Sequence, residues 1–74
     1  MSSSYERYLN EVVNTYDNNH PNLRWGQTYF NVLVDFQPNL AMKIKGTDLD
    51  PYHKEDNELE PFMSYVITRW NMYD

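Results

Sequence analysis

The sequence predicts an all-α fold: a small bundle of three longer helices plus one short helix, with an acidic connecting segment before the last helix. Apolar residues recur at helical spacing over three long segments of the chain. Proline, glycine and asparagine stand between these segments, where turns are expected. A chain of 74 residues is the size of one domain, so residues 1–74 are expected to form a single small helical domain.

The first helix is indicated by an amphipathic pattern near the start of the chain. Ser3 followed by Glu6 has the spacing of a capping box, in which a hydroxyl and a carboxylate bind two free backbone amides. The run 17–19, Asp-Asn-Asn, is expected to end the helix, because asparagine tolerates the left-handed conformation found at helix C-termini. The apolar face of this helix consists of Tyr5, Tyr8, Leu9, Val12, Val13 and Tyr16.

The second helix is expected from about Leu23 to Phe36 and has the widest apolar arc. Other elements are therefore expected to cover it on more than one side, with Trp25 in the core. Gly26 costs about 1 kcal/mol relative to alanine inside a helix, and a close approach by the backbone of another helix would explain its presence. The polar residues form one narrow strip expected to face water, namely Arg24, Gln27, Thr28, Asn31 and Asp35.

Proline and glycine bound the short third helix. Pro38 stops the second helix and can start the next, because proline fits the first helical turn. Gly46 suits the position that follows a helix C-terminus. Within residues 39–45, the apolar side consists of Leu40, Ala41 and Ile44. The last helix is expected from Pro61, and its inward stripe consists of Phe62, Val66 and Trp70, with Met63, Ile67 and Tyr73 beside it.

The net charge of −5 resides in one segment. Eleven acids oppose six bases in the whole chain. Residues 48–60 hold one base, Lys54, and six acids, which are Asp48, Asp50, Glu55, Asp56, Glu58 and Glu60. This acidic segment therefore carries −5 by itself, and the rest of the chain, with five acids and five bases, is neutral. Free nucleic acid is a poor partner for such a chain, because phosphate binding needs a basic surface.

The residues give little support to metal binding or catalysis. A calcium loop that starts at Asp48 would have Tyr52 at position 5, His53 at position 6 and Leu59 at position 12, which breaks the pattern. A site on His53 plus carboxylates lacks paired histidines at i, i+4. Because the chain also has no cysteine, we expect no enzyme, no metal and no cofactor.

Local structure explains four of the six acids in the acidic segment. The first two suit capping or Asx-turn positions, and Asp50 with Pro51 forms a dipeptide typical of helix starts. The last two stand at the N-terminal end of the last helix, where the helix dipole favours negative charge. Glu55 and Asp56 have no local role, so the segment is either a solvated connection or a surface for a partner.

The chain lacks the marks of export and of membrane insertion. Residues 1–20 have no basic start followed by an apolar run. No apolar stretch approaches the ~20 residues that span a bilayer. We therefore expect a soluble, intracellular protein.

Two blocks of the sequence are similar to a known group of proteins. The blocks "RWGQTYFNVL" (24–33) and "IKGTDLDPYH" (44–53), joined by "PNLA" (38–41), resemble small uncharacterised proteins of tailed bacteriophages, including phages of cyanobacteria. The group usually has phenylalanine where this chain has Tyr52. The resemblance implies a phage protein in the host cytoplasm, where small acidic phage proteins frequently bind and inhibit a host protein.

The sequence therefore predicts a non-enzymatic interaction protein, a monomer or homodimer, that binds a host protein with a basic surface. The candidate partner-binding residues are Asp48, Asp50, Tyr52, Glu55, Asp56, Glu58 and Arg24. Two alternatives are open. A small nucleic-acid-binding module would use Arg24, Lys43 and Lys45, whereas a structural or assembly component would self-associate through aromatic surface.

Overall fold

The chain is all-α, as predicted. The computed structural model describes residues 4–19 and 22–73, and these residues form four α-helices, one of them short, and no β-strand. Ser3 of the predicted capping box and the side chain of Tyr73 lie outside the described part. The elements are α1 (Ser4–Asn19), α2 (Trp25–Phe36), α3 (Pro38–Ile44), the 3-10 turn η1 (Asp56–Glu58) and α4 (Glu60–Tyr73).

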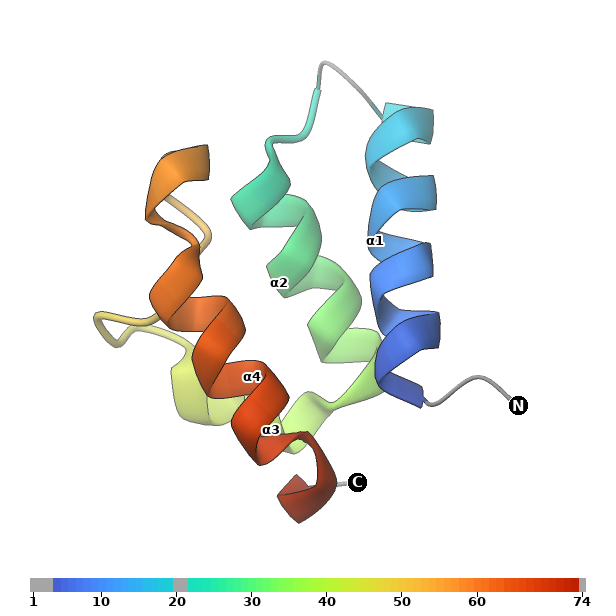
Figure 1. Ribbon diagram of the computed structural model, residues 1–74. Helices are drawn as coiled ribbons and strands as arrows, with labels where there is room; N and C mark the ends of the chain where they lie inside the picture. Colours follow the sequence, from blue (N-terminus) through green and yellow to red (C-terminus); the bar gives the residue numbers. More distant parts are fainter. Residues whose placement is uncertain (1–3, 20–21, 74) are drawn as a thin grey trace.

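Helix α2 lies between α1 and α4, and α3 packs against α2 and α4 (Figure 1). Helices α1 and α4 run in opposite directions and meet where α1 begins and α4 ends. There, the indole Nε1 of Trp70 donates a hydrogen bond to Oγ of Ser4 (2.7 Å), and the Tyr5 and Trp70 rings meet edge to face at 5.3 Å. At the opposite end the two helices stand apart, with α2 between them (Figure 1).

The core lies where the four helices face one another. The inward residues predicted for α3 are all buried, and so are Phe62, Val66 and Trp70 of α4. Ile67, which was expected beside this stripe, is instead 57% exposed. The apolar face of α1 is buried only in part, because Val13 is 49% exposed while Tyr8 and Val12 are covered. The buried cluster consists of Tyr8, Val12, Phe30, Val32, Leu33, Leu40, Ala41, Ile44, Phe62, Val66 and Trp70.

Tyr8 places a hydroxyl group in the core. Its O–H donates to the backbone carbonyl of Tyr29 at 2.8 Å, so the buried hydroxyl has a partner. The ring packs against those of Phe36 and Trp70, with centroids 5.9 Å and 5.1 Å away. Burial raises the pKa of Tyr8 far above its ordinary value, and the neighbouring Tyr29 and Tyr5 raise it further.

One buried polar residue, Gln37, joins α2 to α3. Its backbone N–H donates to the carbonyl of Leu33 (2.7 Å), and its own carbonyl accepts from the N–H of Ala41 (2.9 Å). It thereby closes α2 and opens α3, while Pro38 occupies the first position of α3 as predicted. The side-chain amide reaches α4, where Nε2 donates to the carbonyl of Trp70 at 3.4 Å. The hydrogen bonds of this buried residue therefore link α2, α3 and α4.

Two predictions about α2 need correction. The close approach at Gly26 is present, but it comes from the loop before α4 and not from a helix. A Cβ atom at Gly26 would overlap the carbonyl oxygen of Pro51 and stand 3.1 Å from its carbonyl carbon. Thr28 does not face water, because it is fully buried and its hydroxyl donates to the carbonyl of Arg24 at 2.9 Å. This back-bond satisfies the hydroxyl and lets a polar residue occupy the core.

Candidate partner-binding surface

The first part of the acidic segment is a hydrogen-bonded turn after α3. Gly46 has φ of 77°, the left-handed conformation that glycine adopts without steric cost, and it follows the end of α3 as predicted. The Asp50 carboxylate joins the two sides of the turn. Its Oδ2 accepts from the backbone N–H of Gly46 (2.8 Å), and its Oδ1 accepts from that of Tyr52 (3.0 Å). Asp50 therefore has the turn role expected of it, and both of its oxygens are engaged there.

Pro51 does not start a helix, contrary to the prediction. Its carbonyl accepts from the N–H of Lys54 at 3.0 Å, which closes a turn, and the next helical residues are those of η1. Pro51 is buried, with its carbonyl against Gly26 of α2. This contact holds the start of the acidic segment against the first turn of α2.

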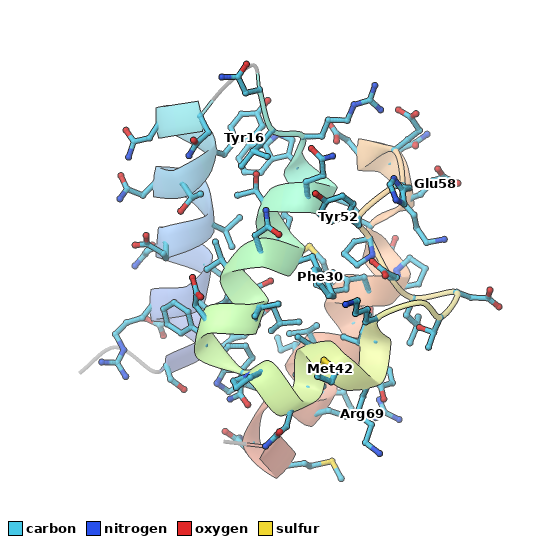
Figure 2. All side chains as sticks on the ribbon, turned by 180° about the vertical axis from the view of Figure 1, so that it is seen from behind. Tyr16, Phe30, Met42, Tyr52, Glu58 and Arg69 are labelled. Atoms are coloured by element: carbon cyan, nitrogen blue, oxygen red, sulfur yellow. The ribbon has the colours of Figure 1, made fainter. Side chains whose placement is uncertain are left out.

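Tyr52 packs on α2 and is half-buried. Its ring meets Phe30 edge to face at 6.3 Å and His53 at 5.1 Å. Figure 2 shows Tyr52 and Phe30 side by side on the face opposite to that of Figure 1. Edge-to-face pairs of this kind stabilise by about 0.5–1.5 kcal/mol beyond the area they bury. The ring of Tyr52, predicted to anchor a partner, thus stabilises the loop between α3 and η1.

Glu55 and Glu58 hold the 3-10 turn η1. The N–H of Glu55 donates to Oε1 of Glu58 (3.1 Å), and the N–H of Glu58 donates to the carbonyl of Glu55 (2.9 Å). The Glu55 carboxylate also pairs with Arg24, with 3.5 Å between Oε1 and Nη1. The expectation that Glu55 has no local role is therefore wrong. Asp56, the next residue, is exposed.

Arg24, Glu55 and Asp56 border a hollow of about 550 Å³ between the end of α1 and η1, which we call the aromatic hollow. The rings of Tyr16 and Trp25 stack there, with centroids 3.7 Å apart and planes 6° from parallel. Trp25 is partly exposed and packs against the buried cluster from outside, so the prediction that it lies in the core is met only in part. The full lining is Tyr16, Leu23, Arg24, Trp25, Glu55, Asp56 and Asn57.

A second hollow, of about 450 Å³, continues from the first between α1 and the beginning of α4. Trp25 and Asp56 border both hollows, which makes the two adjacent. We call the second one the apolar groove, because most of the side chains that line it are apolar. They are Val13, Trp25, Tyr29, Leu59 and Met63, with Asp56 and Glu60 as the acids.

The other predicted residues do not border these two hollows. Asp48 is exposed on the loop after α3. Glu58 borders a different hollow together with His53 and Lys54, and it projects from the edge of the molecule in Figure 2. Lys45, from the nucleic-acid alternative, borders a further hollow, away from Arg24. The structure thus brings Arg24, Glu55 and Asp56 together at one hollow, while Glu58, although hydrogen-bonded to Glu55, borders another hollow. Asp48, Asp50 and Tyr52 do not border the aromatic hollow.

Sequence reasoning missed the apolar part of this surface. Val13 and Tyr16 were assigned to the inward face of α1, and Met63 to the side of the last helix. Adjacent apolar pairs were an available signal: Val12 with Val13, and Phe62 with Met63. Neighbours on a helix point about 100° apart, so one face buries one member of each pair more fully than the other. Val12 and Phe62 are buried, and their partners border the apolar groove.

Further features limit the chemistry of the surface. Within residues 4–19 and 22–73, no three His, Asp or Glu side chains gather closely enough to hold a metal ion. In the same part of the chain, no helix has both the length and the apolar character needed to cross a bilayer.

Comparisons with protein-family models, with curated proteins and with solved structures find no match for this chain.

Proposed function

We propose that this chain is a non-enzymatic interaction protein that binds and inhibits a protein of a phage-infected host cell through an acidic surface. The observation that carries the proposal is the composition of the aromatic hollow. Two carboxylates, those of Glu55 and Asp56, border it together with the exposed edge of the Tyr16–Trp25 stack. The phage setting and the host cytoplasm come from the resemblance of residues 21–53 to small phage proteins.

The two kinds of side chain have different roles in the proposal. Acidic residues steer a basic partner toward the surface and raise the association rate at low salt. Tyrosine and tryptophan supply large, rigid contact area and are the residues most enriched among interface hot spots, together with arginine. Arg24 is available for this purpose, because its pair with Glu55 is exposed and exposed pairs are worth about 0–1 kcal/mol. A partner carboxylate can therefore compete for the guanidinium.

Isosteric neutralisation of the acidic surface tests the proposal. Glu58 accepts a backbone hydrogen bond from Glu55, so replacement by lysine would disturb η1 as well as its charge. The triple variant Glu55→Gln, Asp56→Asn, Glu58→Gln removes three charges and keeps an oxygen acceptor at each position. The tagged wild-type chain is expected to retain a stoichiometric partner from a lysate of infected host cells, and the variant is expected to lose it.

A matched variant controls for the change in net charge. Glu6→Gln, Glu11→Gln, Asp35→Asn also removes three charges, from exposed positions on α1 and α2. This control is expected to retain the partner. Equal retention by both variants, with the same dependence on salt, would show that the acidic segment is only a solvated connection.

A self-assembling component is the second candidate function. Large apolar side chains are exposed on the other faces of α3 and α4, namely Met42, Ile67 and Met72. Such side chains are enriched in interfaces between copies of a chain. Sedimentation across a concentration series distinguishes this function, since it requires a defined oligomer larger than the monomer or dimer expected above.

A further inference from the structure

We infer that the apolar groove binds a basic amphipathic helix of a partner protein, an inference that rests on the proposed function and names the partner's chemistry. The groove is the space between α1 and α4 at the end of the molecule where the two helices stand apart (Figure 1). The contacts of Trp70 with Ser4 and Tyr5 close the other end. The two helices are therefore held together at one end and diverge at the other, where the groove residues lie.

Its walls and floor are helical ridges. Val13 and Tyr16, spaced i, i+3, border the hollows from α1, while Leu59 and Met63, spaced i, i+4, border the groove at the start of α4. Trp25 and Tyr29, again spaced i, i+4, form the floor from α2. Ridges of this spacing receive the side chains of another helix, whose own ridges follow the same i, i+3 and i, i+4 rows.

The groove has apolar surface to offer to such a helix. Val13 is about half exposed, and Met63, Trp25 and Tyr29 are partly exposed. The flexible thioether of methionine adjusts to the shape of an incoming side chain, which is why methionine is frequent on surfaces that bind amphipathic helices. The apolar side of the occupant thus has matching contacts on three sides.

The charges around the groove select a basic occupant. Asp56 and Glu60 are its charged residues, both exposed, and no base is among the described residues that line it. The last turn of α1 contains Asp17 and no base, and the carbonyl end of a helix carries partial negative charge. Arg24 borders the adjacent aromatic hollow, where it is paired with Glu55. An acidic helix would meet repulsion here, and a second copy of this chain would add a net charge of −5.

Two synthetic peptides serve as probes. The first is a helical peptide of about 16 residues with leucine at i, i+3, i+4 and i+7 and lysine on its polar face. The second carries glutamate in place of every lysine. Binding is followed by tryptophan fluorescence, because Trp25 is partly exposed and borders the groove whereas Trp70 is buried. The lysine peptide is expected to bind saturably, and the glutamate peptide is not.

Paired variants locate the binding site. Val13→Gln is expected to raise the Kd for the lysine peptide about tenfold, because it removes apolar surface from a position where either residue is compatible with a helix. Asp56→Asn with Glu60→Gln is expected to raise the Kd at low salt and to flatten its salt dependence. Val34→Gln, at an exposed apolar position of α2 that does not border the groove, is the matched control and is expected to bind as the wild type does.

Each other result overturns the inference. These results are no saturable binding of the lysine peptide, equal binding of both peptides, an equal Kd for Val13→Gln and Val34→Gln, or a dimer that Val13→Gln dissociates. The lysate experiment separates this failure from failure of the proposed function. If the partner is lost with the neutralised acidic surface but the peptide does not bind, the proposed function stands and the helix-binding groove does not. If the peptide binds at the groove but neutralisation leaves the partner bound, the helix-binding groove stands and the proposed binding through the acidic surface does not.

Discussion

Replacement of Gly26 by alanine tests the contact that holds the acidic segment on the helices. An alanine Cβ at this position would overlap the carbonyl oxygen of Pro51, a backbone atom that cannot turn aside as a side chain does. Pro51 is buried and its carbonyl accepts the N–H of Lys54 at 3.0 Å, so the loop has to move as a unit. The substitution is therefore expected to destabilise the fold even though alanine favours a helix.

The magnitude follows from opposing contributions to the free energy of unfolding. Alanine in place of glycine inside a helix gains about 1 kcal/mol. Overpacking against a well-packed site costs about 1–3 kcal/mol, and loss of the hydrogen bond to Pro51 costs about 1 kcal/mol more. The net expectation for Gly26→Ala is a loss of about 1–3 kcal/mol. For a domain of this size, each kcal/mol lowers Tm by roughly 4–8 °C.

Urea unfolding followed by far-UV circular dichroism measures this loss, provided that the slope m is unchanged. Gly46→Ala is the comparison, because a Cβ at Gly46 meets no atom within 4 Å and the cost there comes from φ of 77°. Asparagine tolerates that conformation, so Gly46→Asn is expected to recover part of the loss, whereas Gly26→Asn is not. If Gly26→Ala is as stable as the wild type or more stable, the Pro51 backbone does not lie against α2, and the reasoning is refuted.

Other substitutions probe single interactions. Asp50→Ala removes the acceptor of two backbone N–H groups and is expected to lower stability by about 1–3 kcal/mol in urea unfolding, with Asp50→Asn, which keeps one oxygen, losing less. The raised pKa of Tyr8 means that unfolded chains ionise first, so stability is constant below about pH 10 and falls above it by up to about 1.4 kcal/mol per pH unit. Urea midpoints measured from pH 8 upward are expected to fall less steeply for Tyr8→Phe; an equal slope would mean that Tyr8 titrates normally. Glu55→Gln breaks the exposed pair with Arg24 and is expected to change stability by less than about 1 kcal/mol; a larger loss would contradict the view that the pair is weak.

The helices could be predicted because each one depends on local patterns. The spacing of Phe62, Val66 and Trp70 specifies a buried helix face whatever it packs against, and Pro38 and Gly46 mark helix ends by their own backbone preferences. The role of Asp50 in a turn is also local, since both of its partners lie within four residues.

The candidate surface could not be predicted in the same way, because it depends on contacts between distant segments. Nothing near Glu55 in the sequence indicates a pair with Arg24, 31 positions away. The exposure of Trp25 depends on how far α1 and α4 diverge, which the periodicity of single helices does not determine. The sequence therefore located the charge correctly. It did not show that the fold divides the acidic segment among several hollows, so the segment was treated as one surface.

Residues 24–33 and 44–53, the two blocks named in the sequence analysis, pack against each other in the fold. Gly26 of the first block lies against Pro51 of the second, and Phe30 of the first packs on Tyr52 of the second. Gly46 supplies the left-handed turn that brings the second block back to α2.

The chain needs this internal contact, to which Gly26, Phe30, Gly46 and Tyr52 contribute, regardless of its partner. Residues that could select a partner lie largely outside the blocks. Val13, Tyr16, Asp56 and Met63 border the aromatic hollow or the apolar groove, and none is in residues 24–33 or 44–53. Substitutions within the internal contact are therefore expected to affect the fold more strongly than the choice of partner. Partner choice is expected to follow the residues of α1, η1 and the first turn of α4, together with Arg24 and Trp25 of the first block.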